Sequence, residues 1–120
     1  MVWRNEPRES IELVVLSLLA EGARHGYGIL KEVAARSEGQ VRLGPGVLYP
    51  LLKSLESGGL VAGSWETVRA EEGEGEGRRR KWYRLTPKGR KRLDQRLAAH
   101  RRYRALIDAL TGRTGEEASS

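Results

Sequence analysis

The sequence predicts a mainly α-helical fold with one small β-hairpin, and three patterns carry this prediction. Apolar residues recur at helical spacing along much of the chain, as in Leu48, Leu51, Leu52 and Leu55 at i, i+3, i+4 and i+7. Two short segments rich in aromatic residues follow, joined by a polar, glycine-rich stretch. A second long helical pattern then continues to Leu110.

Size and composition limit the classes of protein. The 120 residues suffice for one domain with an appendage, and the net charge is +6. The chain has no cysteine, which excludes a disulfide framework and a thiolate metal site and fits a reducing cytoplasm. No apolar run approaches the roughly 20 residues that span a bilayer. The opening residues lack the apolar centre of a secretion signal. We therefore expect a cytoplasmic protein with no membrane partner.

Basic residues are concentrated late in the chain. Between Arg78 and Arg104 there are thirteen Lys or Arg and a single acid, Asp94. Such a run favours nucleic acid as a partner. An arginine-rich surface encoded by a GC-rich genome is the alternative explanation.

Two helices are expected before position 40. Ser10 is a candidate cap for the first, and Gly22 can end it in the left-handed conformation. A turn over residues 23–26 leads to a second helix near residues 27–37. Residues 40–43 form a short link, too brief to predict a strand. The residues expected to face the core are Ile11, Val14, Val15, Leu18, Leu19, Ile29, Leu30, Val33 and Ala34.

The third helix contains two prolines. Pro45 suits the first helical position, where its missing N–H has no partner to lose. Pro50 lies further in and crowds the carbonyl of Gly46, so the helix either bends or starts late. The backbone around Gly46 would then be open to close approach. The side opposite the leucines carries Tyr49 and Lys53, as expected of a helix that enters a nucleic-acid groove. The two prolines are also explained by a purely structural role, in starting and bending the helix.

Residues 60–67 and 80–85 are predicted strands, because Trp65, Trp82 and Tyr83 favour a pleated surface. The segment between them, VRAEEGEGEGRR, is expected to be a mobile hairpin tip. A hairpin directly after a groove-type helix is the wing of a winged helix.

Thr86 and Pro87 are the cap and first residue of a last helix. This helix is too long to be buried on the small domain before it, so a second copy of the chain is its simplest partner. The alternative folds it back on the first helix of its own chain. Residues 111–120 should be disordered. The predicted dimerisation residues are Leu93, Leu97, Tyr103, Leu106, Ile107 and Leu110.

No pattern of catalytic or cofactor-binding residues is present. His25 and His100 lie in different elements without carboxylates at ligand spacing, so no metal site is expected. Gly26 and Gly28 lack the third glycine and the preceding strand of a dinucleotide fingerprint. No serine, histidine and acid share a recognisable arrangement. We predict neither an enzyme nor a cofactor.

Three motifs now stand in order along the chain: LSLLAEGARHGYGILKEV, GPGVLYPLLKSLESGGLV and GRRRKWYRLTPKGRKRL. Together they resemble the PadR family of bacterial transcriptional regulators, from Ile11 to about Leu110. The chain is similar to the short members of that family, which have a single C-terminal dimerisation helix.

The resemblance implies a homodimeric winged helix-turn-helix repressor that binds a palindromic operator in double-stranded DNA and releases it on a signal. It divides the chain into an N-terminal arm (residues 1–9), a DNA-binding domain (10–86), a dimerisation helix (87–110) and a tail (111–120). The third helix would enter the major groove and the wing would follow the minor groove. By resemblance, the DNA-contacting residues are Tyr27, Gly46, Val47, Tyr49, Pro50, Lys53, Arg78, Arg79 and Arg80.

The sequence departs from the family pattern at two places. Gly44 and Val47 replace a serine and a threonine before the Leu-Tyr-Pro motif, which removes a better cap and a hydroxyl. The glutamates of the wing tip (Glu71, Glu72, Glu74 and Glu76) would be repelled by phosphates, so the tip should stay outside the groove.

Two further interpretations stay open. These departures favour a protein-interaction or ligand-sensing module of the same fold with weakened DNA binding. The basic charge could also bind RNA, but the sequence shows no aromatic platform of the kind that RNA-binding domains use. The resemblance also implies a small aromatic effector near the dimer interface, for which Trp3 and Tyr103 are the aromatic residues placed to line a pocket.

Overall fold

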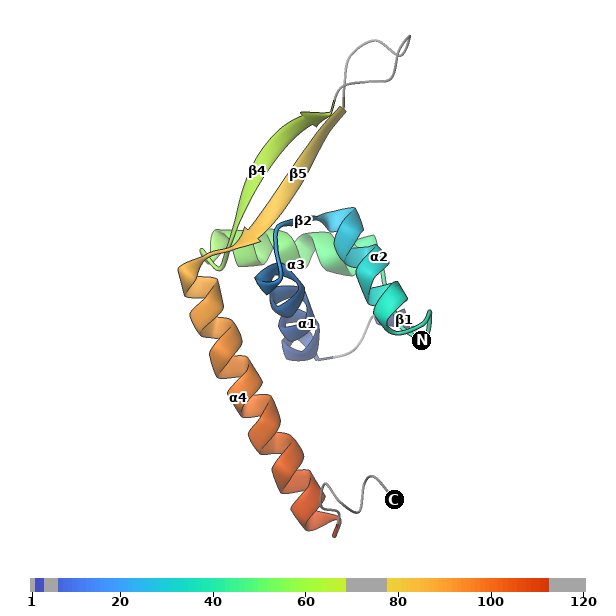
Figure 1. The fold of residues 1–120 in the computed structure, drawn as a ribbon, viewed down its shortest axis with the longest axis vertical. Coiled ribbons are helices and arrows are strands. Elements are labelled where there is room, and N and C mark those ends of the chain that lie inside the picture. The colour runs from blue at the N-terminus through green and yellow to red at the C-terminus, as the bar shows by residue number, and fades with distance from the viewer. Residues whose placement is uncertain (1, 4–6, 69–77, 113–120) are drawn as a thin grey trace.

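Three helices form the body of the molecule, a β-hairpin extends from one side of it, and a long helix extends from the other (Figure 1). The computed structural model describes residues 2–3, 7–68 and 78–112. This is the predicted mainly α-helical fold with a small hairpin. The larger elements are α1 (Arg8–Ala20), α2 (Gly26–Arg36), α3 (Pro45–Ser57), β4 (Val61–Val68), β5 (Arg78–Leu85) and α4 (Pro87–Leu110).

The core is aliphatic and centred on α1 and α3. Leu48, Leu51, Leu52 and Leu55 are all buried, which confirms the leucine seam of the third helix. The remaining buried apolar residues come from α1, α2, β3 (Arg42–Leu43), the hairpin with the residue before it, and the start of α4. They are Ile11, Val15, Leu16, Leu18, Leu19, Ile29, Val33, Leu43, Leu60, Val61, Tyr83 and Leu93.

Two short strand pairings were not expected from the sequence. β2 (Arg24–His25) joins the hairpin as an edge strand antiparallel to β5, where a plain turn was predicted. β1 (Val2–Trp3) pairs in parallel with β3 (Arg42–Leu43), where only a link was predicted. Trp3 is consequently half-buried against the chain's own core and is not a free arm. Strands of two residues are too short to show a periodic pattern. They form because each pairs with a strand that is distant in the sequence.

The helix boundaries also differ from those predicted. α1 begins at Arg8 after Pro7, so Ser10 is not its cap but lies in its first turn, donating its N–H to the Pro7 carbonyl at 2.9 Å. Proline supplies the extended backbone that starts the helix, with no side-chain cap. α3 is helical throughout from Pro45 to Ser57 despite Pro50, which excludes a late start.

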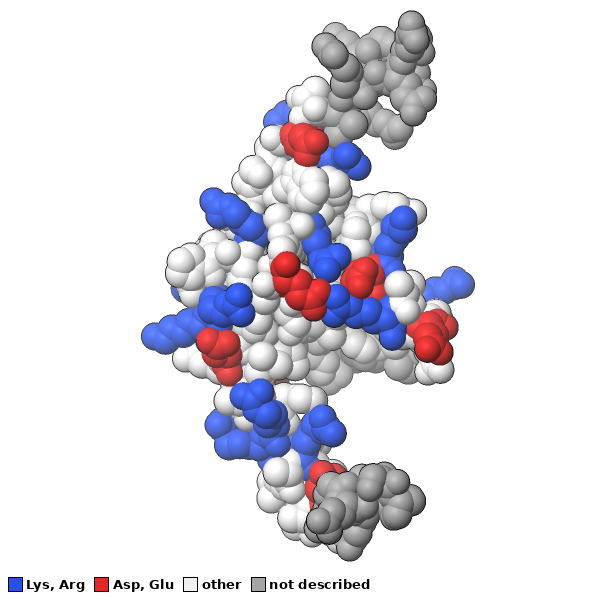
Figure 2. All heavy atoms as spheres, viewed as in Figure 1, with Lys and Arg blue, Asp and Glu red and all other residues white. Residues whose placement is uncertain are grey.

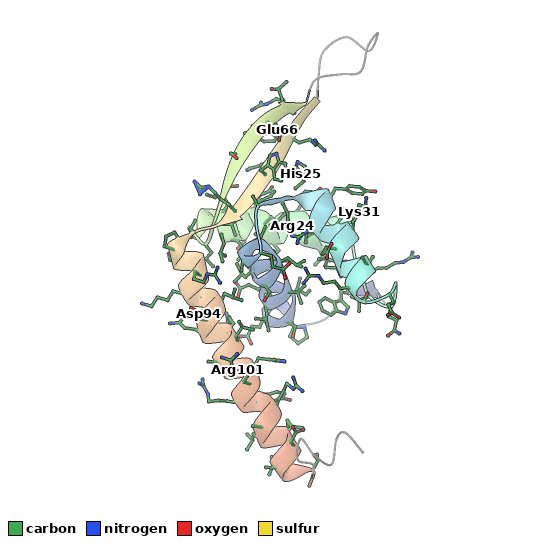
Figure 3. The ribbon with its side chains drawn as sticks, in the orientation of Figure 1. Arg24, His25, Lys31, Glu66, Asp94 and Arg101 are labelled. Carbon is green, nitrogen blue, oxygen red and sulfur yellow. The ribbon has the colours of Figure 1, made fainter. Side chains whose placement is uncertain are left out.

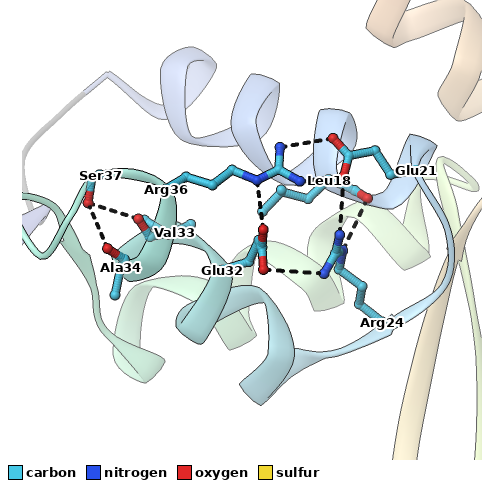
Figure 4. Close-up of polar contacts among 8 residues, drawn as sticks. All are labelled: Leu18, Glu21, Arg24, Glu32, Val33, Ala34, Arg36 and Ser37. Atoms are coloured by element: carbon cyan, nitrogen blue, oxygen red, sulfur yellow. Dashed lines mark hydrogen bonds and ion pairs between the residues drawn. The ribbon is translucent and has the colours of Figure 1, made fainter.

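Ion pairs join the end of α1 to α2 (Figure 4). The Arg36 guanidinium donates to Glu21 and, at 2.8 Å, to Glu32. Arg24 donates to Oε1 of Glu21, an oxygen it shares with Arg36, and to the Leu18 carbonyl at 3.3 Å. The hydrogen bond from Arg36 lowers the pKa of Glu21. These partly exposed pairs fix the helices in register more than they add stability.

The first half of α4 packs on the chain's own α1. Glu12 is only 5% exposed, and its carboxylate accepts from the Nε of Arg96 at 3.0 Å and lies 3.5 Å from Arg92. Leu93 is buried beside this cluster, and Leu97 packs against the core. The alternative in which the last helix folds back on α1 therefore describes its first half.

A compact joint connects α3, the hairpin and α4. The Leu60 carbonyl accepts from the Thr86 N–H at 3.1 Å, and the Thr86 hydroxyl lies within 3.0 Å of it. The same hydroxyl caps α4 by accepting from the Gly89 N–H at 3.0 Å, as the sequence predicted for Thr86. A Cβ on residue 89 would lie 2.0 Å from the Leu60 carbonyl oxygen, so only glycine fits there.

Two expectations fall mostly outside the described part of the chain: the mobile wing tip (residues 68–79) and the disordered tail (111–120). At the ends of the predicted tip, Val68, Arg78 and Arg79 belong to the strands and not to a loop. Thr111 and Gly112 form a turn after α4. In the described ranges, no helix combines the length and apolar character needed to cross a membrane.

Gly89→Ala should lower the free energy of unfolding by about 2 kcal/mol, because the added methyl clashes with backbone at Leu60 and the backbone must move. Urea denaturation measures the change. Gly46→Ala is the matched control, since a Cβ there meets nothing within 4 Å. Equal stability of the two variants would contradict the close packing of Gly89 against the Leu60 carbonyl.

Candidate nucleic-acid interface

The outward side of α3 carries the predicted groove residues. Tyr49 is 43% exposed, and Gly46, Pro50 and Lys53 are also exposed. The buried leucine seam holds the helix on the core and presents this side to solvent. Val47 is different: it is half-buried and packs against the core. Its aliphatic side chain therefore has a packing role where the family pattern has a hydroxyl.

The start of α2 lies against this side of α3. Tyr27 is 66% exposed, and the Lys31 ammonium lies 5.6 Å from the centre of its ring. The N-cap residue His25 provides no side-chain hydrogen bond to the first turn. A helix N-terminus with free amides favours an anion such as phosphate. Tyr27 thus stands beside a position suited to a DNA backbone.

The wing has two different faces. One face carries Trp65, which is 58% exposed, with the Arg79 guanidinium 4.6 Å from its ring centre and Lys81 opposite it in register. The other face carries Arg80, which lies opposite Glu66. Neighbouring strand residues point to opposite faces, so Arg79 and Arg80 cannot act from the same side. Arg78 lies at the start of β5.

Trp82 occupies the second face at the base of the wing. Its indole N–H donates to Glu66, and its ring lies 3.7 Å, centre to centre, from the ring of His25. Figure 3 labels these two partners, Glu66 and His25. His25 thus packs within the small sheet, at a position where the sequence predicted a plain turn. This tilted ring contact joins the start of α2 to the wing.

Lys81 anchors the first face of the wing to α3. Its ammonium lies 2.7 Å from the Glu56 carboxylate, and this hydrogen bond raises the pKa of Lys81. Gly63 makes room for the pair, because a Cβ there would lie 2.3 Å from Lys81 Cε. Lys81 is therefore a structural cation. Sequence reasoning had included it in the basic run and had missed its partner.

The basic run does not form one surface. The exposed cations of α4 lie on the opposite side of the body from the wing, and Figure 2 shows them gathered over that helix. Arg92 and Arg96 are paired with Glu12. The exposed lysines and arginines of α4 are Lys88, Arg90, Lys91, Arg101, Arg102 and Arg104.

The predicted dimerisation residues divide along α4. Leu93 is 2% exposed in the chain's own core, so its assignment to a dimer contact is corrected: the monomer already covers it. Leu97 is half-buried on the same side. The distal residues are exposed, with values of 63% for Tyr103, 57% for Leu106, 38% for Ile107 and 74% for Leu110.

Trp3 and Tyr103 do not meet in one pocket. Trp3 lines an open, mainly apolar groove of about 420 Å³ with residues of α1, α2 and Leu97. Tyr103 lines a separate hollow of about 450 Å³ between the start of α1 and α4. Within the described ranges, no group of three His, Asp or Glu side chains could hold a metal ion.

A winged helix-turn-helix with a solvent-facing third helix is the architecture of a DNA-binding regulator. The profile of the transcriptional regulator PadR-like family matches residues 15–95. The chain belongs to this family, whose members regulate transcription and are not enzymes.

Similarity to individual transcriptional regulators supports this assignment. The transcriptional regulator Rv3488 of Mycobacterium tuberculosis is 33% identical over 92 residues, which cover 77% of each chain. The transcriptional regulator YqjI of Escherichia coli is 35% identical over 63 residues, 52% of this chain but only 28% of YqjI. The solved structure of a transcriptional regulator from Clostridium thermocellum superposes with a TM-score of 0.71 at 27% identity, covering 85% of this chain and 93% of that one.

Proposed function

We propose that the protein is a homodimeric repressor that binds a palindromic operator in double-stranded DNA. Residues 10–86 bind the DNA, and residues 87–110 form the dimer. The observation that carries the proposal is the outward side of α3, where Tyr49 and Lys53 stand exposed above a fully buried leucine seam.

In this proposal α3 enters the major groove and reads base edges with Tyr49 and Lys53. The exposed backbone at Gly46 and the ring of Pro50 allow close approach of the duplex. Tyr27 and the start of α2 contact a phosphate. Within the wing, the Arg79 guanidinium lies over Trp65, on the face that Lys81 joins to Glu56 of α3, and Arg80 would contact DNA from the other face. Arg78 is proposed as a contact from its place at the start of β5.

Dimerisation is supported by the distal half of α4. It carries four large exposed apolar side chains, and burying such a stripe against a second copy is favourable. Two-fold symmetry of the protein then requires a palindromic operator.

Repression and release by a small aromatic effector rest on the family resemblance. Trp3 and Tyr103 line separate hollows, so we assign an effector to neither. The interaction-module alternative rested on Val47 and on the acidic wing tip. Core packing accounts for the valine, and the wing tip lies outside the described residues.

Tyr49→Ala and Lys53→Ala should each weaken operator binding by about 1–3 kcal/mol, the worth of one good base or phosphate contact, with no loss of the dimer. Fluorescence anisotropy with an operator selected from genomic fragments measures this. Lys91→Ala, an exposed lysine on α4, is the matched control and should bind normally. Normal binding by both α3 variants would show that α3 is not the reading helix.

Operator affinity should fall steeply with salt. With roughly six to ten phosphate contacts per dimer, the log–log slope of affinity against salt should be about −5 to −9. Titrations at several salt concentrations give this slope directly. A value near zero would rule out an interface built on the proposed cations.

Leu106→Asp should convert the dimer into monomers, because it places an unpaired charge in the distal stripe. Sedimentation velocity measures the mass. Ala105→Asp introduces the same charge about half a turn away from the stripe, so it should leave the dimer intact. A dimeric Leu106→Asp protein would disprove dimerisation through the distal stripe of α4.

A further inference from the structure

We propose that Gly26 is the positioning residue for Tyr49: the absence of a side chain at the start of α2 sets where the recognition tyrosine of α3 points. The inference rests on the proposed function, because it assigns a role to Gly26 through the DNA contact of Tyr49. Gly26 itself touches no DNA in this proposal.

The contact is specific and close. A Cβ on residue 26 would lie 2.5 Å from Cε1, 2.8 Å from Cζ and 2.8 Å from the hydroxyl oxygen of Tyr49. All three atoms belong to the outer end of the ring, and none could remain at such a distance from a carbon atom. The tyrosine therefore lies across the bare backbone of Gly26, which is buried beneath it.

The backbone of Gly26 does not itself require glycine. Among the glycines that the structure describes, those with positive φ are Gly22, Gly39, Gly59 and Gly112, and Gly26 is not one of them. What the position requires is space for the ring of Tyr49. Gly28, two residues further along the same helix, has nothing within 4 Å of its Cβ position and carries no such requirement.

The effect of a side chain at residue 26 should be on the ring and not on the fold. The neighbouring atoms are the far end of a flexible side chain, so rotation of Tyr49 relieves the clash. At Gly89 the neighbour is the Leu60 backbone, which cannot turn aside. Gly26→Ala should therefore leave the helices in place and move the tyrosine hydroxyl away from its groove-facing position.

The test compares operator binding in four variants. Gly26→Ala should weaken binding about tenfold or more, as Tyr49→Ala does, while Gly28→Ala should stay within about twofold of the parent. In the Tyr49→Ala background, Gly26→Ala should cause no further loss, because the ring it displaces is gone. Independent losses in the double variant would overturn the proposal, as would parental binding by Gly26→Ala alone.

A measurement without DNA follows the ring directly. In protein with ¹³C-labelled tyrosine, Gly26→Ala should shift the ring signals of Tyr49, and Gly28→Ala should not. Thermal unfolding should be equally cooperative in both variants; an unfolded Gly26→Ala protein would overturn the proposal, since the ring would then not absorb the clash. If Tyr49→Ala binds the operator normally, the DNA contact of the proposed function fails, while the ring shift still reports whether Gly26 places Tyr49.

Discussion

The carbonyl of Leu60 is the point on which the rest of the structure depends. Leu60 lies between the end of α3 and the first strand of the wing, and its carbonyl accepts the N–H of Thr86, the cap residue of α4. Gly89 brings the first turn of α4 against it with no side chain between. Lys88 adds a hydrogen bond to the Gly58 carbonyl at 2.8 Å. Three elements with different tasks are thus joined through backbone atoms, which leaves little freedom for one to turn without the others.

Most of the fold was predictable because its elements repeat a pattern. The leucines of α3 and the apolar stripe of α4 recur at helical spacing and so predict helices. Thr86-Pro87 predicts a helix start from local chemistry alone. β1 and β2 were not predictable, because two-residue strands have no period. Trp3 illustrates the limit: its sequence neighbours describe an arm, while its burial comes from a parallel pairing with β3, about forty residues away in the chain.

The candidate site divides in the same way. The exposure of Tyr49 and Lys53 follows from the seam beneath them, so helical periodicity sufficed. The supporting contacts join different elements and leave no local signal. Lys81 looks like any other member of a basic run until Glu56 is placed beside it. Gly26 looks like part of a turn until the ring of Tyr49 lies across it.

The separation of the basic run has a practical consequence for purification and assay. Heparin and other polyanions bind by total accessible positive charge, with little regard for which surface supplies it. The exposed arginines of α4 would hold the protein on such a matrix from the side away from the wing. Retention on heparin would therefore persist in proteins whose α3 no longer recognises an operator. Only a duplex of defined sequence, with a scrambled duplex as competitor, separates recognition from simple ion exchange.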